Sequence, residues 1–311
     1  MKTNKCPFFN ICGGCRYDFS DEKYKSEKLS DLPKLSFTRD PIWGGVGCRR
    51  RSDFAFIDGH FGFYKKQSKD IVNINKCINV VDEINEILPM LAKLPWRGTG
   101  SVLVTKCENG LDVAVQSMLP CFGADFKTAV EKLPPQIIRF VWNDKIIRKY
   151  ATPQIKFNDK ILDYPPHAFL QPTIETEQIL RDLVIKYTDN ATPVADLFCG
   201  LGNFTFATNA IGFDIVGNGI ERDLFKKPLS VKQLNNYKVV IMDPPRNGAL
   251  KQSKELSESM VKKIIYVSCN PKTFIRDKKI LESGGYTVTT LIPVDQFVGS
   301  SHWEIFSVFE K

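Results

Sequence analysis

Two short motifs in the carboxyl-terminal third of the chain carry residue types that can do chemistry. They are Asp243-Pro244-Pro245-Arg246 and Ser268-Cys269-Asn270-Pro271. Each directly follows a run rich in β-branched residues, and such runs are typical of strands buried on both faces of a parallel sheet. Ligand sites in open α/β sheets lie at the carboxyl ends of the strands, so the sequence predicts that the acid and the thiol share a cleft. Cys269 is the candidate nucleophile of that cleft.

A third motif indicates what the cleft binds. Residues 194–204 are typical of a strand that ends near Asp196, a turn that contains Gly200 and Gly202, and the start of a helix. Such a turn lets a ligand approach the backbone at a helix N-terminus. The spacing Asp-x-x-x-Gly-x-Gly is typical of methyltransferases that bind S-adenosyl-L-methionine, and an ordinary tight turn in a Rossmann-like unit is the alternative. Cys199, inside the motif, is expected to be a packing thiol.

Nine cysteines in a chain without an apolar leader favour metal or catalytic roles over a disulfide framework. Three of them, Cys6, Cys12 and Cys15, crowd the amino end, and two glycines between the close pair allow a tight loop. Cys77 is the expected fourth ligand and Cys48 the second choice. Four thiolates suit an iron–sulfur cluster or structural zinc, and the spacing does not decide between them. Unrelated buried thiols are the third reading.

Length and composition predict a two-domain protein of the cytoplasm. A chain of 311 residues exceeds one core of typical size, and no apolar run reaches the roughly 18 residues that span a bilayer. The expected domains are residues 1–165, which are β-rich and hold the cysteine cluster, and residues 166–311, which are α/β. The net charge of +8 favours a polyanionic partner.

The first domain carries a hairpin signal and basic segments. Residues 52–57 and 60–64 alternate around an Asp58-Gly59 turn, which predicts two paired strands, and a short helix is expected from about residue 81 to Leu88, ended by Pro89. The basic segments 49–51 and 65–69 lie near aromatic residues, a combination that suits an RNA strand. Solvated charges beside core aromatics are the alternative reading.

Taken together, these motifs resemble those of the RNA uracil-5-methyltransferase family, from one end of the chain to the other. The matching residues are Cys6-x5-Cys12-x2-Cys15, Gln171, 196–204, 243–246, 268–271, 293–297 and His302-Trp303-Glu304. The resemblance implies a Rossmann-like methyltransferase domain that uses S-adenosyl-L-methionine, preceded by a [4Fe-4S] cluster on Cys6, Cys12, Cys15 and Cys77. The chain starts at the cluster, as the shorter ribosomal RNA enzymes do. The expected substrate is therefore 23S ribosomal RNA, with tRNA as the alternative, and a monomer is expected.

The resemblance also implies roles for single residues. Cys269 adds to carbon 6 of uracil, which makes carbon 5 nucleophilic toward the methyl group, and Glu304 then removes the carbon 5 proton so that the thiol leaves. Arg246 is a candidate neighbour that favours the Cys269 thiolate. Asp295 is expected to help hold the uracil ring, and His302 to be structural. The expected contacts of the methyl donor are Gln171, Phe198, Asn203 and Asp243.

One departure from the family pattern concerns the segment between Asp196 and Asp243. It spans 47 residues, whereas two strands and three helices need roughly 60 or more at ordinary loop lengths. The sequence therefore predicts that about one strand–helix pair is missing. Glu221, in a Gly-Ile-Glu context, is the favoured candidate for the acid that binds the adenosine ribose; the alternative is that this acid is gone.

Two further hypotheses remain open. The first is a non-catalytic RNA-binding iron–sulfur relative that has lost donor binding; retention of both Cys269 and Glu304 argues against it. The second is an amino-group methyltransferase, since Asp-Pro-Pro-x also occurs in that class, although such enzymes need no thiol.

Overall fold

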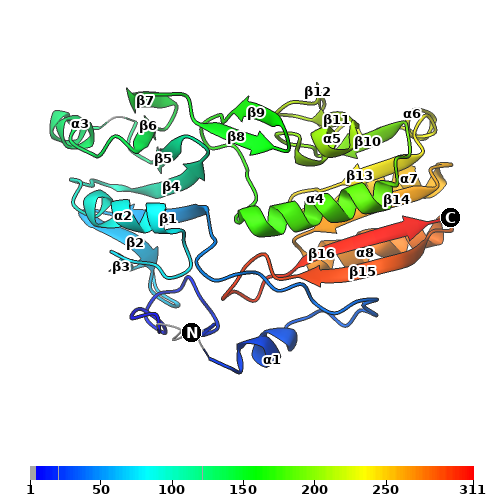
Figure 1. The fold of residues 1–311 in the computed structure, drawn as a ribbon, viewed down its shortest axis with the longest axis horizontal. Coiled ribbons are helices and arrows are strands. Elements are labelled where there is room, and N and C mark those ends of the chain that lie inside the picture. The colour runs from blue at the N-terminus through cyan, green and yellow to red at the C-terminus, as the bar shows by residue number, and fades with distance from the viewer. Residues whose placement is uncertain (1–4, 20, 121) are drawn as a thin grey trace. The chain divides into compact units, whose positions relative to one another are not determined.

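The computed structural model describes residues 5–19, 21–120 and 122–311, which form two compact units (Figure 1). The first unit contains Met1–Leu29, Gly45–Ile174 and Val298–Ser301, and the second contains Ser30–Gly44, Glu175–Phe297 and His302–Lys311. The main division thus falls nine residues beyond the expected one at 165. Two short segments cross this division: residues 30–44 belong to the second unit, and residues 298–301 belong to the first.

The first unit is built on a seven-stranded, mostly antiparallel sheet in the order β3-β2-β1-β4-β5-β6-β7. Helices α2 and α3 cover one face, where their apolar residues join the core with Phe54, Phe56 and Trp142. The elements are α1 (Tyr24–Leu29), β1 (Arg51–Ile57), β2 (His60–Tyr64), β3 (Ile71–Asn73), α2 (Asp82–Leu91), β4 (Thr99–Cys107), β5 (Gly110–Ser117), α3 (Ala124–Glu131), β6 (Ile137–Trp142), β7 (Lys145–Lys149), β8 (Gln154–Phe157) and β9 (Lys160–Asp163).

The hairpin prediction is confirmed, because β1 and β2 pair antiparallel around Asp58 and Gly59. The helix prediction was wrong at its end. Pro89 lies inside α2, which continues to Leu91, and the apolar face of the helix is buried on the sheet. Packing of that face outweighs the local cost of a proline near the carboxyl end of the helix.

A buried ion pair lies on the other face of this sheet. Arg139 on β6 donates to Asp112 on β5 at 2.7 Å, and the Asp112 side chain is completely buried. A second pair, Arg97 with Asp125, has the same 2.7 Å separation at the surface. The two pairs differ mainly in burial, which makes them a natural comparison for stability.

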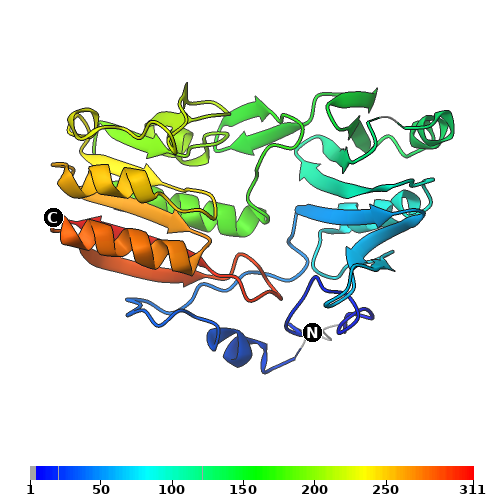
Figure 2. The same ribbon diagram turned by 180° about the vertical axis from the view of Figure 1, so that it is seen from behind.

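The second unit is a mixed sheet in the order β12-β11-β10-β13-β14-β16-β15, parallel except for β16, which is antiparallel to both of its neighbours. Helix α4 covers one face, whereas α7 and α8 cover the other, as the two opposite views show (Figures 1 and 2). The elements are α4 (Ile174–Thr188), β10 (Val194–Leu197), α5 (Asn203–Thr208), β11 (Ile211–Asp214), β12 (Ile220–Glu221), α6 (Val231–Leu234), β13 (Val239–Met242), α7 (Leu250–Glu258), β14 (Lys263–Ser268), α8 (Pro271–Ser283), β15 (Thr287–Val294) and β16 (Glu304–Glu310).

The predicted loss of a strand–helix pair is wrong for the strand and right for the helix. β12 is present as two residues paired in parallel with β11, Asp214 opposite Glu221. Five residues, 215–219, connect these strands without a helix. Such a short parallel connection is possible because β12 has only two residues. The chain that leaves β11 at Asp214 needs to return only to the level of Phe213, where Ile220 pairs.

Within the described part of the chain, no helix is long and apolar enough to cross a membrane.

Candidate active site

The carboxyl ends of β13 and β14 bring the two predicted chemical motifs together. Met242, the last residue of β13, lies opposite Tyr266 on β14, so Asp243 and Cys269 follow neighbouring strand ends. Asp243 contributes to the electrostatics of the Cys269 thiol, as does Arg246. The prediction that the acid and the thiol share one site is therefore supported by the geometry.

Glu304 reaches this site through the antiparallel ladder between β14 and β16. The last pair of that ladder is Ser268 opposite Ile305, and Cys269 and Glu304 come next on the two chain segments. Side chains directly opposite on antiparallel strands point to the same face and lie about 5 Å apart. The Glu304 carboxyl accordingly raises the pKa of the Cys269 thiol. The thiol is partly exposed, whereas Glu304 is buried.

The Asn270-Pro271 pair explains how the thiol is held. Asn270 is the N-cap of α8, where its side chain accepts a hydrogen bond from the Lys272 N–H at 3.1 Å, and Pro271 occupies the first helical position. The Asn270 amide also donates to the Arg246 carbonyl at 2.8 Å. One asparagine thus starts the helix and fixes the neighbouring Asp-Pro-Pro-Arg loop.

The glycine-bearing turn after β10 is shaped by two carboxylates. Asp196 is fully buried and accepts from the Thr205 hydroxyl at 2.6 Å, while its Oδ1 has no partner. Asp214 ends β11 and accepts from the Gly200 N–H at 2.9 Å. A Cβ on Gly217 would lie 1.9 Å from the Gly200 carbonyl oxygen, so the short 215–219 connection packs directly on the turn.

Asn203 presents a buried donor at the N-terminus of α5. Its Oδ1 accepts from Arg181 Nε at 2.7 Å, and its Nδ2 has no partner. Buried amide donors are normally hydrogen-bonded, so an unpaired one at a glycine turn suits a ligand acceptor. With Asp196 Oδ1 and Glu304 Oε1, the second unit thus holds three unpaired buried polar atoms at or near its strand ends.

The site is strongly acidic. Burial, followed by repulsion from Asp196 and Asp214, raises the pKa of Asp243 to about 7. Burial also raises the pKa of Asp196 to about 7, and burial with repulsion from Asp243 raises that of Glu304 well above its ordinary value. A positively charged ligand would relieve this accumulation of carboxyl groups.

The same surroundings act on the nucleophile. Burial and the Glu304 and Asp243 carboxyls raise the pKa of the Cys269 thiol to about 12, and Arg246 opposes them more weakly. The expectation that Arg246 favours the thiolate is right in direction, but in the protein without ligands the carboxyls outweigh it.

The three remaining residues that were predicted to contact the methyl donor lie in different parts of the structure. Phe198 follows β10 with a positive φ of 62° and packs its ring on Phe225 at 5.3 Å. Glu221, the favoured ribose-binding acid, ends β12 and is exposed, whereas Asp214 is the acid that ends β11. Gln171 belongs to the first unit, where its carbonyl accepts from Arg50 Nε at 3.1 Å. Their roles toward the donor stay predictions.

Sequence reasoning missed Asp214, and it gave no role to Gln296, which lies in the matching segment 293–297. The strand that ends at Asp214 has only four residues, and its Gly-Phe-Asp sequence was the available signal. Gln296 is buried and donates to Glu304. Of the neighbouring predictions, Asp295 is fully buried and His302 packs against Phe297 at 6.1 Å. Cys199 is buried, as expected of a packing thiol.

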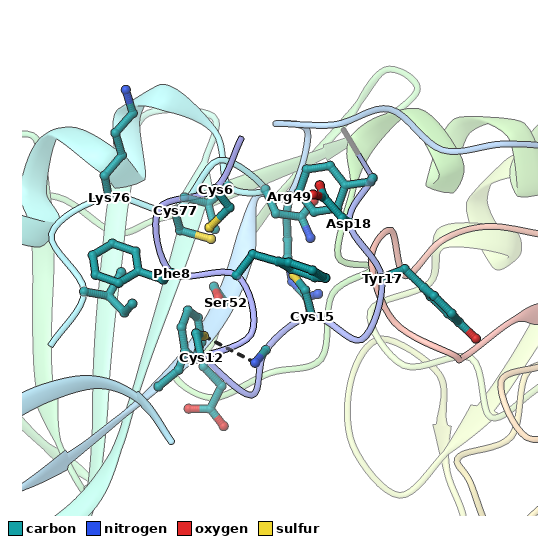
Figure 3. Close-up of a pocket in the computed structure, with 18 residues that line it drawn as sticks. Cys6, Phe8, Cys12, Cys15, Tyr17, Asp18, Arg49, Ser52, Lys76 and Cys77 are labelled. Carbon is teal, nitrogen blue, oxygen red and sulfur yellow. Dashed lines mark hydrogen bonds between the residues drawn. The ribbon is translucent and has the colours of Figure 1, made fainter. Parts of the chain in front are cut away.

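The four predicted metal-ligating cysteines line one cavity of about 250 Å³ in the first unit (Figure 3). The loop that carries Cys12 pairs with the end of β2, where the Gly13 N–H donates to the Tyr64 carbonyl at 2.8 Å. Burial, then repulsion from the other three thiols, raises the pKa of Cys15 to about 12.

No three cysteine, histidine or carboxylate side chains in the described ranges are grouped so that they could hold a metal ion. A tetrahedral zinc site would need four sulfurs, each about 2.3 Å from one centre. The thiols instead surround a cavity, and the metal assignment stays a prediction. Cys48, the second choice, is not among the residues that line this cavity.

The arginine triplet 49–51 is partly committed to contacts within the first unit. Arg50 is buried and holds the 171–172 backbone, and Arg49 lies among the cysteines, where burial lowers its pKa. Only Arg51 reaches an exposed aromatic ring, that of Phe169, at 5.5 Å. The 65–69 segment, by contrast, is exposed throughout.

Comparison with known proteins identifies the family. Residues 221–311 match the family model described as tRNA (Uracil-5-)-methyltransferase. An uncharacterized RNA methyltransferase of Brucella melitensis is 33% identical over 350 residues, covering 98% of this chain and 84% of the relative. The chain belongs to the RNA (uracil-5-)-methyltransferase family.

A more distant relative and a solved structure are also similar to this chain. The 23S rRNA (uracil(1939)-C(5))-methyltransferase RlmD of Histophilus somni is 26% identical, over all of this chain and 82% of that protein. The solved structure of Pyrococcus abyssi tRNA (uracil-54, C5)-methyltransferase, in complex with S-adenosyl-L-homocysteine, has a TM-score of 0.71 at 20% identity, covering 92% of this chain and 82% of that one. The structural likeness confirms the Rossmann-like methyltransferase fold.

Proposed function

We propose that this family member transfers a methyl group from S-adenosyl-L-methionine to carbon 5 of a uridine in 23S ribosomal RNA. The observation that carries the proposal is the closeness of Cys269 and Glu304 just beyond the last pair of the β14–β16 ladder, beside Asp243. This pairing supplies a nucleophile and a proton acceptor on the same face of one sheet edge. The choice of ribosomal RNA rests on the 26% identical relative that carries that activity in its name.

The chemistry assigned to the pair is a covalent addition and its reversal. The Cys269 thiolate forms a bond to carbon 6, and the electron pair of the carbon 5–carbon 6 double bond moves into an enolate. After carbon 5 has gained the methyl group, Glu304 takes its proton. The electrons of that C–H bond restore the double bond as sulfur leaves carbon 6 as a thiolate.

Acceptance of that proton suits the position of Glu304. Burial and Asp243 favour its protonated form, so the carboxylate is a stronger base than an exposed glutamate. One of its oxygens, Oε1, has no partner and is available to the proton.

S-adenosyl-L-methionine, when bound, supplies the methyl group from a sulfonium cation. The chain offers Asn203 Nδ2 as a hydrogen-bond donor and Asp214 beside the glycine turn as an acceptor. Asp196, which is buried, and Asp243, which is partly buried, provide a negative environment, and a cation there would lower the pKa of the Cys269 thiol. We therefore expect the thiol to be activated only after the donor is bound.

For the first unit we propose a [4Fe-4S] cluster on Cys6, Cys12, Cys15 and Cys77. Support comes from their shared cavity of about 250 Å³ and from the electrostatic coupling among the four thiols. A cluster places each sulfur on a different iron, so it needs a ring of thiols around a space rather than around a point.

Two variants test the catalytic assignment. Cys269→Ala should abolish methyl transfer to ribosomal RNA while calorimetry shows unchanged donor binding. Glu304→Gln should retain addition but lose proton removal, so a covalent protein–RNA band should persist on a denaturing gel. Val308→Ala, a buried change on the same strand, serves as the control for β16 packing. Normal turnover of the Cys269 variant would refute the nucleophile.

One observation favours the alternative of an RNA-binding relative without donor binding. The Gly200 N–H is bound by Asp214, and the Gly200 carbonyl accepts from the Asn218 N–H at 3.1 Å, so the short connection occupies part of the turn. Calorimetry separates the two functions: no detectable binding at millimolar donor would establish the alternative.

A further inference from the structure

We propose that Gln296 is a positioning residue for Glu304, which it holds in the ionised form with Oε1 turned to the substrate. The proposal rests on the proposed function, and it adds a residue to which the sequence motifs gave no role. Gln296 lies two residues beyond β15, is 2% exposed, and donates from Nε2 to Glu304 Oε2 at 3.2 Å.

The other end of the glutamine amide is bound by a different element. Thr176, fully buried on α4, donates its hydroxyl to Gln296 Oε1 at 3.2 Å. An ionised carboxylate only accepts hydrogen bonds, so the N–H2 end of the amide faces Glu304 and the carbonyl end accepts from Thr176. The two hydrogen bonds thus form a directed chain from Thr176 through Gln296 to Glu304.

The contact has a defined consequence for the two carboxyl oxygens. Oε2 is occupied by the amide, whereas Oε1 is buried without a partner. A base that must reach one carbon atom benefits when only one of its oxygens remains available in a fixed direction. The main chain supports this arrangement, since Gln296 N–H donates to the Val294 carbonyl at 3.0 Å and Val294 lies opposite Glu304 in the β15–β16 ladder.

The contact also acts on protonation. The charged and titratable groups near Glu304 are Asp243 after β13 and Cys269 after β14, with Arg246 on the loop beside the thiol and Asp295 next to Gln296. Asp243 disfavours the carboxylate, and a donated hydrogen bond from the amide favours it. Loss of that donor should therefore shift the titration of Glu304 to higher pH.

The test uses Gln296→Met, which keeps the volume and removes the donor. The matched control is Gln252→Met, another buried glutamine of the second unit, whose amide binds only the Leu229 backbone among the described residues. We expect proton removal to slow by about 10- to 100-fold, the usual effect of losing a hydrogen bond to a charged group. The protein–RNA adduct should accumulate, the acidic limb of the pH–rate profile should move up, and donor affinity should stay within about twofold.

A second variant and a direct titration complete the test. Thr176→Val, which leaves Gln296 in place, should shift the pH profile in the same direction by a smaller amount. Carbon-13 labelling of glutamate followed by nuclear magnetic resonance reports the Glu304 titration without any turnover, so it tests the contact even if the enzyme proves inactive. Coincident Glu304 titrations in the wild type and Gln296→Met, with normal folding by circular dichroism, would overturn the proposal.

Discussion

The Cys269 thiol should be nearly unreactive in the protein without ligands, first because it is desolvated and next because Glu304 disfavours its thiolate. With a pKa of about 12, only about one Cys269 in ten thousand is a thiolate at pH 8, against about a quarter for an ordinary cysteine. Since the thiolate is the species that is alkylated, iodoacetamide should modify Cys269 about a thousandfold more slowly than a free small-molecule thiol.

Glu304→Gln should restore part of that reactivity. An ionised Glu304 and a Cys269 thiolate about 5 Å apart, the spacing of opposed residues on antiparallel strands, would repel by about 3 kcal/mol at an effective dielectric constant of 20. That energy corresponds to about two pKa units. Partial exposure of the thiol screens the repulsion, so we expect about one unit and a tenfold faster alkylation near pH 8.

The assay is alkylation over a pH series, with mass spectrometry of the peptide that contains Cys269 to separate it from the other cysteines. Glu310→Gln is the matched control, because it removes a carboxylate from the far end of the same strand, where Glu310 pairs with Lys263. Equal rates in the Glu304 and Glu310 variants, or an unmodified protein that reacts as fast as a free thiol, would refute the electrostatic reasoning.

Three other predictions concern the rest of the chain. Arg139→Met should lower the free energy of unfolding in urea by about 3–5 kcal/mol, because it leaves a buried carboxylate unpaired. Arg97→Met, at the exposed pair, should lower it by less than about 1 kcal/mol. Similar losses in the two variants would contradict this ranking. Burial raises the pKa of Asp196 and Asp243 from 3.8 to about 7, so their contribution to stability is complete below about pH 4 and lost as the pH rises through 7. Asp243→Asn should therefore flatten the fall of the melting temperature with rising pH. An unchanged pH profile of the melting temperature would argue against this reasoning. Protein purified without air should be brown, and Cys15→Ser should be colourless by visible absorption; a colourless, zinc-containing wild type would reverse the metal assignment.

The strand ends could be predicted because they depend on local patterns. The apolar runs before Asp243 and Cys269 are long enough to identify buried strands, and their order fixes which ends are neighbours. The hairpin of β1 and β2 was visible for a similar reason, since Asp58-Gly59 specifies the turn.

Other features depend on contacts that no local pattern encodes. β12 has two residues, too few for any periodicity, and its place at the sheet edge comes only from pairing with β11. The burial of Arg50 follows from the 171–172 backbone, which is distant in sequence. Likewise, Gln296 meets Glu304 only because the turn from β15 to β16 returns the chain to the same place.

The register of β14 against β16 decides whether this unit can be a catalyst at all. A slip of one residue would turn every β16 side chain to the opposite face, and Glu304 would leave the face that carries Cys269. Both faces of β16 are buried from Glu304 to Phe309, so alternation of polar and apolar residues does not set this register. Instead it is constrained by specific contacts, such as the Ser307 hydroxyl, which donates to the Tyr266 carbonyl at 2.8 Å on the neighbouring strand. The catalytic pair is therefore held by side-chain packing several residues away from the site.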